Sequence, residues 1–418
     1  MGRVSAPAAP PAPLNRRIVV SWCLYDFANS AYSAVISATV FSVYFARVIV
    51  GNERGLGDLW WGRVVALSMI LVALTSPILG SVADRAGVRK RMLFAFTYLC
   101  IASVALFTTI QPGMILWAVA LAVLANVGFE GSLVYYNAYL PDIAPPERRG
   151  FVSGLGFGIG YAGSALALLA ALPLVSRGHY GLTWLVVMLF LVVFSLPAFL
   201  VLPRDRGASV PARRAAVEGI IHFGRLLRDV LAERPLRRFL AAYFLYIDGV
   251  ETTIIFASNF AAQTLGFSQG QIILMFLAVQ LSALAGALGL AKPIDRWGAK
   301  PVIKLTLIVW VAVAVAAYFV QSKAAFFAVA VVAGTVLGPV QAASRALMAS
   351  LIPSGKQAEL FGFYAVVGKS SAVLGPLVFG GVSHALGGNQ RAAVLSVGTF
   401  FVLGLALLQR VREDGSRR

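Results

Sequence analysis

Twelve apolar segments in succession are the feature that most restricts the fold of this chain of 418 residues. Each is about as long as the roughly 20 residues that an α-helix needs to cross the hydrocarbon core of a bilayer. Only 12% of the residues are charged, against about 25% in a soluble protein. Because lipid offers no partner to backbone N–H and C=O groups, such segments must form helices. We therefore predict an all-α polytopic membrane protein with transmembrane helices near 18–48, 59–82, 92–110, 113–140, 151–174, 182–203, 237–262, 270–292, 302–321, 324–350, 359–382 and 391–410.

The basic residues predict the orientation of these helices. The formal net charge is +18, and most of the 35 Lys and Arg residues fall in alternate loops. Loops rich in Lys and Arg remain in the cytoplasm, so both termini are predicted to be cytoplasmic. The basic residues punctuate apolar segments, and we therefore expect no nucleic acid partner.

Three polar stretches divide the chain. Residues 1–16 are rich in Ala and Pro and are predicted to be a disordered tail. Residues 204–236 are predicted to be a cytoplasmic linker that contains an amphipathic helix, because apolar residues recur there at near-helical spacing between charged ones. Residues 412–418 form a second tail. The remaining stretches, 17–203 and 237–411, hold six apolar segments each.

A tight basic turn, Gly80 to Arg91, separates the second and third segments. It reads Gly-Ser-Val-Ala-Asp-Arg-Ala-Gly-Val-Arg-Lys-Arg, and a degraded copy, Pro293 to Lys300, follows the eighth segment. The repeat indicates that the two halves are versions of one unit. The turn resembles the signature of the major facilitator superfamily. The resemblance implies twelve transmembrane helices in two pseudo-symmetric six-helix halves.

The same resemblance assigns a role to the turn. It implies that Asp84 bonds backbone or a basic group near segment 11 and latches the cytoplasmic side in one state. The alternative is that the turn only sets topology, and the second copy lacks the full basic tail. The predicted gating residues are Gly80, Asp84, Arg85, Gly87, Arg89, Asp295 and Arg296.

Polar groups inside the apolar segments are the candidate functional residues, because ionisable groups are costly in lipid. The superfamily resemblance implies that segments 1, 4, 7 and 10 line a central cavity, and most of the candidates fall on those four. Segments 1 and 7 each carry an Asp with a polar residue at i+3, which places both groups on one helix face. The candidates for substrate or proton binding are Asp26, Asn29, Glu130, Asn137, Asp248, Glu251, Gln341, Arg345 and Lys369.

The positions of the charged candidates suggest which of them interact with each other. Glu130 and Arg345 lie at nearly equivalent places in the two halves, so they can face each other across the cavity. Lys369 belongs to segment 11 and can instead neutralise an acid. For Asp26 and Asp248, hydrogen bonding between neighbouring helices is the alternative role.

Four stretches resemble a narrower group, the fungal vacuole-effluxer family and its bacterial relatives. They are Tyr25-Asp26-Phe27-Ala28-Asn29-Ser30-Ala31-Tyr32, Tyr136 to Asp142 with Gly150 to Gly154, Tyr243 to Val250, and Gln341 to Ala346 with Gly362 to Lys369. The resemblance implies a transporter, with amino-acid efflux proposed for fungal members. Short loops and the charge bias favour a bacterial inner membrane.

The sequence thus predicts a secondary transporter that works by alternating access and has a small-molecule substrate. Asp26, Asp248 and Glu251 would bind a cationic group or carry a coupling proton, and Arg345 with Lys369 would bind an anionic group. A site with both signs suits a zwitterion such as an amino acid. We expect a monomer in the lipid bilayer. No Gly-x-x-x-x-Gly-Lys-Ser/Thr loop is present, so ATP is not the expected energy source.

Other functions remain as alternatives. A broad-specificity drug exporter would need a large apolar, aromatic cavity. A transporter-like receptor without flux would need a larger soluble surface than the linker offers. The chain has only three His and two Cys, the latter within apolar segments, and neither an enzyme, a metal site nor a cofactor is expected.

Overall fold

A computed structural model describes residues 15–85, 87–145, 149–205, 211–352 and 357–411. These residues form helices and no strands. The first half contains α1 (Arg16–Ala31), η1 (Tyr32–Thr39), α2 (Val40–Tyr44), η2 (Phe45–Val50), η3 (Glu53–Gly55), α3 (Leu56–Arg85), α4 (Arg89–Leu106), η4 (Phe107–Thr109), α5 (Ile115–Ala138), α6 (Leu140–Ile143), α7 (Arg149–Ser176) and α8 (Tyr180–Val201). The second half follows the crossing helix α9 (Ala212–Ala232), and it contains α10 (Arg234–Leu265), α11 (Gln269–Trp297), α12 (Ala299–Phe319), α13 (Lys323–Leu351), α14 (Gln357–Ser371), α15 (Leu374–Ala385) and α16 (Gln390–Gln409).

Twelve helical stretches of the described residues are long and apolar enough to cross a membrane, which confirms the predicted fold class. The first stretch is continuous from Arg16 to Val50. The eleventh was predicted as one helix over 359–382 and is instead interrupted between α14 and α15. The predicted amphipathic helix of the linker corresponds to α9. Of the tail predicted over 1–16, residues 1–14 lie outside the described residues, as does the tail at 412–418, whereas Asn15 caps α1 and Arg16 begins it.

Short polar signals set several helix ends. The side chain of Asn15 accepts hydrogen bonds from the backbone N–H groups of Arg17 and Ile18 at the start of α1. Ser268 and Gln271 form a reciprocal capping box at the start of α11. Gly266 ends α10 with φ of +67°, a left-handed conformation that glycine adopts without steric cost. These signals separate α10 and α11 into antiparallel neighbours.

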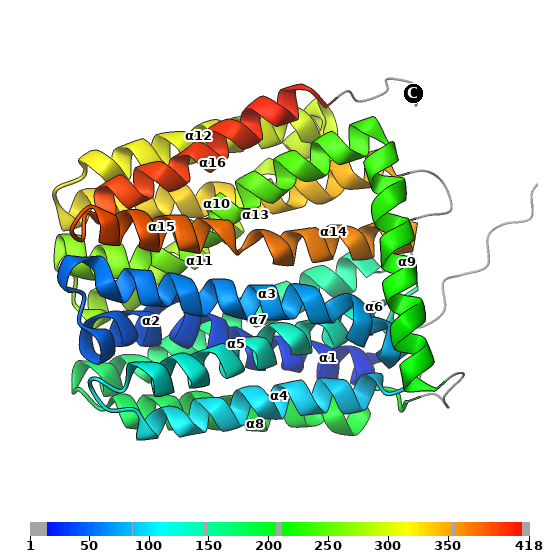
Figure 1. Ribbon diagram of the computed structural model, residues 1–418, viewed down its shortest axis with the longest axis horizontal. Coiled ribbons are helices and arrows are strands. Elements are labelled where there is room, and N and C mark those ends of the chain that lie inside the picture. The colour runs from blue at the N-terminus through cyan, green and yellow to red at the C-terminus, as the bar shows by residue number, and fades with distance from the viewer. Residues whose placement is uncertain (1–14, 86, 146–148, 206–210, 353–356, 412–418) are drawn as a thin grey trace, which may run out of the picture.

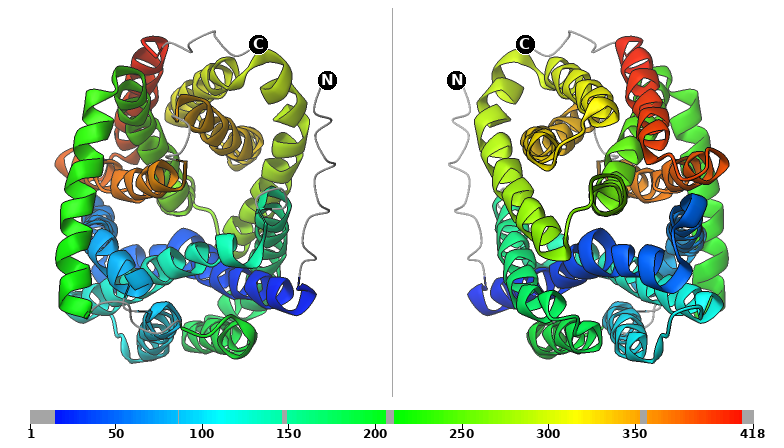
Figure 2. Two further views of the ribbon diagram at one scale, coloured as in Figure 1. Left: turned by 90° about the vertical axis from the view of Figure 1, so that its right-hand side faces the viewer. Right: turned by 90° about the vertical axis from the view of Figure 1, so that its left-hand side faces the viewer.

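The two halves lie side by side, and their helices run roughly parallel to one long axis (Figure 1). Within the first half, α1 packs on α7 and α8, and α4 packs on α5. Within the second, α10 packs on α16 and α11 packs on α13. Three seams join the halves: α3 lies against α14 and α15, α7 lies against α11, and η1 and α2 lie against α10. Figure 2 shows the two halves end on.

The bundle has two unlike ends. We call the end crossed by α9 the α9 end, and the end with residues 51–58 and 386–390 the far end (Figure 1). One buried apolar cluster crosses between the halves and includes Phe41 and Trp61 together with Phe256 and Phe379. The other two clusters each belong to one half, and they occupy the parts of the helices near the α9 end. Buried apolar packing therefore joins the halves at the far end, while the two clusters near the α9 end do not cross between the halves.

Candidate functional site

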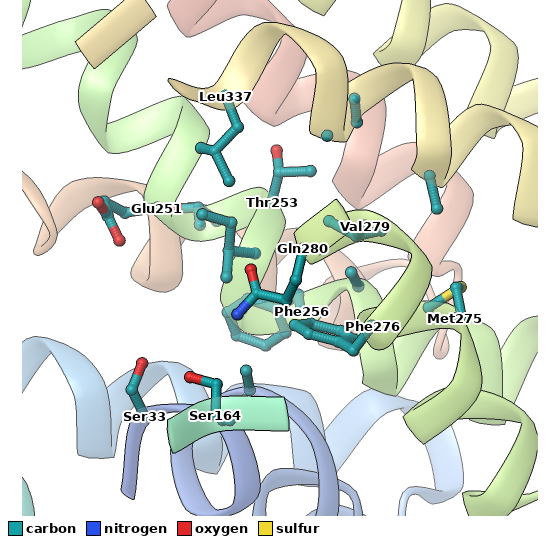
Figure 3. Close-up of a pocket in the computed structure, with 18 of the residues that line it drawn as sticks. Ser33, Ser164, Glu251, Thr253, Phe256, Met275, Phe276, Val279, Gln280 and Leu337 are labelled. Carbon is teal, nitrogen blue, oxygen red and sulfur yellow. The ribbon is translucent and has the colours of Figure 1, made fainter. Parts of the chain in front are cut away.

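The centre of the bundle contains a cavity made of two adjoining chambers that share lining residues. The near chamber, on the α9 side, has a volume of about 530 Å³, and the far chamber has a volume of about 370 Å³. Both are lined by Ser33, Phe129 and Glu251, so residues of both halves contribute to each. Figure 3 shows the far chamber, with Ser33 and Ser164 facing Glu251, Phe256 and Gln280 across the space between the halves.

Charged side chains from both halves meet in the near chamber. Glu130 of α5 forms an ion pair and hydrogen bond with Lys369 of α14. Arg345 of α13 lies over the ring of Phe157 of α7, with 5.1 Å between the guanidinium carbon and the ring centroid. Glu130 and Arg345 line the same chamber, as their positions in the repeat suggested, but the ionic partner of Glu130 is Lys369. Among the described residues, Arg345 has no ionic partner.

The first span widens where it passes the cavity. Its α-helix gives way at Tyr32 to a π-helical segment, and Thr39 donates a hydrogen bond to the carbonyl of Ala34, five residues earlier. π-helical turns inside long helices are frequent at functional sites. Just before this segment, Asp26 and Asn29 line the far chamber. Asn29 also donates to Ser132 of α5 over 3.4 Å.

Asp248, at the equivalent place in the second half, has a different environment. It is fully buried, and its carboxylate accepts hydrogen bonds from the backbone N–H of Gly375 at 2.8 Å and from Thr252 at 3.3 Å. Gly375 lies in the first turn of α15, where N–H groups lack an intrahelical partner. Asp248 therefore caps the break between α14 and α15, and it does not line either chamber.

The remaining candidates line the cavity without a hydrogen bond to other described residues. Asn137 lies in the near chamber, and Gln341 lines both chambers. Glu251 also lines both, close to the Glu130–Lys369 pair.

The predicted gating residues are only partly described. The side chains of Asp84, Arg85 and Asp295 lie outside the described residues. Arg89 donates to the carbonyl of Ala138 at 2.9 Å and pairs with Asp142 at 2.6 Å, which ties α4 to α5 and α6 within one half. Gly87 has a φ of +63° at the turn. Gly80 is half-buried, and Arg296 is exposed at the end of α11.

A polar network at the far end was not predicted from the sequence. Asp58 at the start of α3 is fully buried and accepts hydrogen bonds from Ser383 of α15 at 2.7 Å and from Gln390 of α16 at 2.9 and 2.8 Å. Gln390 in turn accepts from Thr264 of α10 at 2.7 Å. This network joins the halves where the cavity is closed. The only sequence signal was an acid in the first turn of an apolar helix.

Solved structures of transporters share this architecture. A D-xylose–proton symporter superposes with a TM-score of 0.72 at 17% identity, and the match covers 96% of this chain and 99% of that one. The nucleoside transporter NupG superposes with a TM-score of 0.70 at 13% identity, covering 94% and 98%. At these identities the likeness concerns the fold.

Sequence comparison is more specific. The uncharacterized MFS-type transporter YxiO of Bacillus subtilis is 30% identical over 409 residues, which cover 95% of each chain. Autophagy-related protein 22 of Coccidioides immitis is 25% identical over 449 residues, covering 88% of this chain and 74% of that protein. The family described as Vacuole effluxer Atg22 like matches residues 63–418. This chain therefore belongs to the Vacuole effluxer Atg22-like family of major facilitator transporters.

Proposed function

We propose that this protein is a secondary transporter that moves a small zwitterion, such as an amino acid, across the membrane by alternating access. The observation that carries the proposal is a central cavity lined by both halves and by charges of both signs. A buried apolar cluster joins the halves at the far end, whereas the clusters near the α9 end do not cross between them, and this asymmetry supports one of the two states that such a mechanism requires.

The charges suggest how a zwitterion would bind. Arg345 has no ionic partner among the described residues, and its planar guanidinium suits two parallel hydrogen bonds to a carboxylate. Glu251 and Asp26 line the cavity as acids and would bind an ammonium group or carry a coupling proton. Lys369 is neutralised by Glu130 in this state, so it would become available only when that pair opens.

The proposed orientation places the α9 end in the cytoplasm, with both termini on that side of a bacterial inner membrane. The positive-inside bias of the loops supports it. The bacterial relative YxiO supports the same membrane. In this orientation, the apolar closure between the halves lies on the periplasmic side, and substrate would leave the cell when the protein acts as an effluxer.

The test is uptake of a labelled amino-acid mixture into liposomes that contain the purified protein, driven by an imposed pH gradient. We expect the wild type to accumulate at least one amino acid. Arg345→Gln should abolish uptake. Arg345→Lys should retain part of it, because lysine keeps the positive charge but lacks the planar guanidinium group that can donate two parallel hydrogen bonds to a carboxylate. Asp26→Asn should lose gradient-driven accumulation but retain exchange if this acid carries the proton.

Arg177→Gln is the matched control, because Arg177 is an exposed arginine at the far end, outside the cavity. It should transport like the wild type. Absence of flux with every amino acid, in protein that is monodisperse and folded, would overturn the substrate assignment. Unchanged uptake by Arg345→Gln would overturn the site.

A second function, export of amphipathic drugs, is favoured by one observation. Phe256, Phe260, Phe276 and Met275 line the far chamber and make much of it apolar. Expression in a drug-sensitive strain separates the two functions, since a drug exporter raises resistance to several unrelated compounds and an amino-acid effluxer does not.

A further inference from the structure

The crossing helix α9 has an apolar surface that the protein does not cover. Val217, Ile220, Ile221, Leu227 and Leu231 are between 39% and 53% exposed. On a helix with about 100° between successive residues, these five positions fall on one continuous arc. Large apolar side chains gathered in this way on an exposed face mark an interaction surface. We call these five residues the α9 stripe.

A separate arc of α9 faces the protein. Leu226 and Val230 are buried in the apolar cluster of the second half, and the ring of Phe223 lies 5.6 Å from that of Phe363 of α14. The helix also packs along α3 of the first half. The stripe is therefore not part of the contact that holds α9 in place, and it adjoins that contact on the helix circumference.

The third arc of α9 is polar. It carries Arg214, Glu218 and Arg225, while Arg228 falls within the stripe, between Val217 and Ile221 on the helix circumference. Arg214 pairs with Glu218 at 2.8 Å. Arg225 and Arg228 are exposed and have no ionic partner among the described residues. Around its axis, α9 therefore has three surfaces: one packs on the protein, one is apolar and exposed, and one is polar with basic residues.

The position of α9 indicates what covers the stripe. Figure 1 shows α9 crossing the other helices nearly at right angles close to one end, and in Figure 2 it lies along the margin of the outline. It lies beside the ends of the spanning helices, at the depth where lipid headgroups surround such a bundle. An amphipathic helix with arginines next to an apolar face is suited to this interface.

We propose that α9 is a lipid-binding strap: the α9 stripe inserts into the acyl boundary of one leaflet, and Arg225 and Arg228 bind anionic lipid headgroups. Charge complementarity favours this occupant, because the leaflet on the predicted cytoplasmic side is the one whose anionic lipids attract basic segments. Since α9 contacts α3 of one half and α14 of the other, bound lipid is linked to the relative position of the halves.

Depth measurement tests the insertion. In a background with Cys23→Ala and Cys100→Ala, a nitroxide is attached at Ile220→Cys or at Arg225→Cys, and the full chain is placed in vesicles of phosphatidylcholine and phosphatidylglycerol. We expect the label at position 220 to be accessible to oxygen and shielded from a water-soluble nickel chelate, and the label at 225 to show the reverse. Equal exposure of both labels to the chelate would overturn insertion and point to a protein partner.

Lipid affinity tests the headgroup contacts. Binding of phosphatidylglycerol to the purified protein is measured by native mass spectrometry for Arg225→Gln, Arg228→Gln and the control Arg177→Gln at the far end. Each α9 variant should bind the anionic lipid about fivefold more weakly, the effect of about 1 kcal/mol per basic residue near an anionic surface. Equal affinity of all three variants and the wild type would overturn the proposal. Neither readout depends on transport, so failure here leaves the proposed function untouched.

Discussion

Asp26 and Asp248 occupy equivalent places in the two halves but have different surroundings. In each half, a residue with a hydroxyl group lies four positions after the acid: Ser30 follows Asp26, and Thr252 follows Asp248. A glycine of a neighbouring helix packs against the acid and the hydroxyl in both cases. In the second half the glycine is Gly375, whose N–H donates to Asp248. In the first, Asp26 has no hydrogen-bond partner among the described residues and lines the cavity. Of these equivalent acids, Asp248 therefore holds two helices together, whereas Asp26 faces the cavity.

This difference predicts opposite phenotypes. Asp248→Ala leaves a buried N–H without a partner, which costs about 1–3 kcal/mol, so we expect a lower thermal transition of the purified protein. Asp248→Asn keeps a side-chain carbonyl that can accept from Gly375 and should unfold close to the wild-type temperature. Asp26→Ala should leave the transition unchanged and lower flux in proteoliposomes.

The opposite result for either residue would contradict this assignment. A normal transition for Asp248→Ala would mean that its bond to Gly375 contributes little to stability. Wild-type flux in Asp26→Ala, combined with loss of flux in stable Asp248→Asn, would assign the coupling role to the second half.

The candidate residues could be predicted from the sequence because charge is costly inside apolar segments, whereas their pairing could not. The i+3 spacing indicated which helix face they share, but the bond to Asp248 depends on a helix break at residues 372–373 that apolar composition does not reveal. Likewise, Glu130 and Arg345 line one chamber as expected, yet Lys369 reaches Glu130 because α14 lies against α3 at the seam.

At the scale of the elements, the start of α3 is fastened to α15 and α16 by Asp58. Its carboxylate is buried and bonded to Ser383 and Gln390. Opening of the far end must separate α3 from α15, and this exposes or breaks those bonds. We therefore predict that Asp58→Ala shifts the conformational equilibrium toward an open far end. The loss of about 1–3 kcal/mol corresponds to a shift of roughly fivefold to 150-fold.

Alkylation of a single cysteine measures this shift. Ala257→Cys lines the far chamber and should react slowly with a membrane-impermeant maleimide added from the far side. Adding Asp58→Ala should accelerate the reaction by at least roughly fivefold. The control is Asp142→Ala, whose partner Arg89 lies in the same half, and it should leave the rate unchanged. Equal rates with and without Asp58 would show that the network does not hold the far end closed.

Element boundaries followed from apolar composition with small differences, because segment length is set by the bilayer. Irregularities within the transmembrane helices could not be predicted from apolar composition. Two examples are the π-helical turn at Tyr32–Thr39 and the interruption of the eleventh span. Both depend on packing against neighbouring helices, and the sequence of one segment does not show which helices will pack against it. The amphipathic helix α9 could be predicted because its apolar and charged residues alternate with a helical period.

At the scale of the molecule, the repeated turn predicted the division into halves because each copy occupies an equivalent loop. The sequence could not show which end is closed, since that depends on contacts between halves. The seam at the far end is tight: a Cβ at Gly62 of α3 would overlap the carbonyl of Pro376 of α15. The proposed alternating-access mechanism requires this seam to separate during transport, so its closure can be tested.

A reversible disulfide cross-link between the halves at the far end tests whether they must separate during transport. Ser258 of α10 donates a hydrogen bond to the carbonyl of Ala38 in the other half, so their backbones are close enough for a disulfide. With Cys23 and Cys100 replaced by Ala, we predict that Ala38→Cys/Ser258→Cys transports when reduced, stops when oxidised and recovers with dithiothreitol. Oxidant should not affect either single variant. Transport by the fully cross-linked protein would mean that substrate crosses without separation of the halves at this end, and alternating access by rocking would then be wrong.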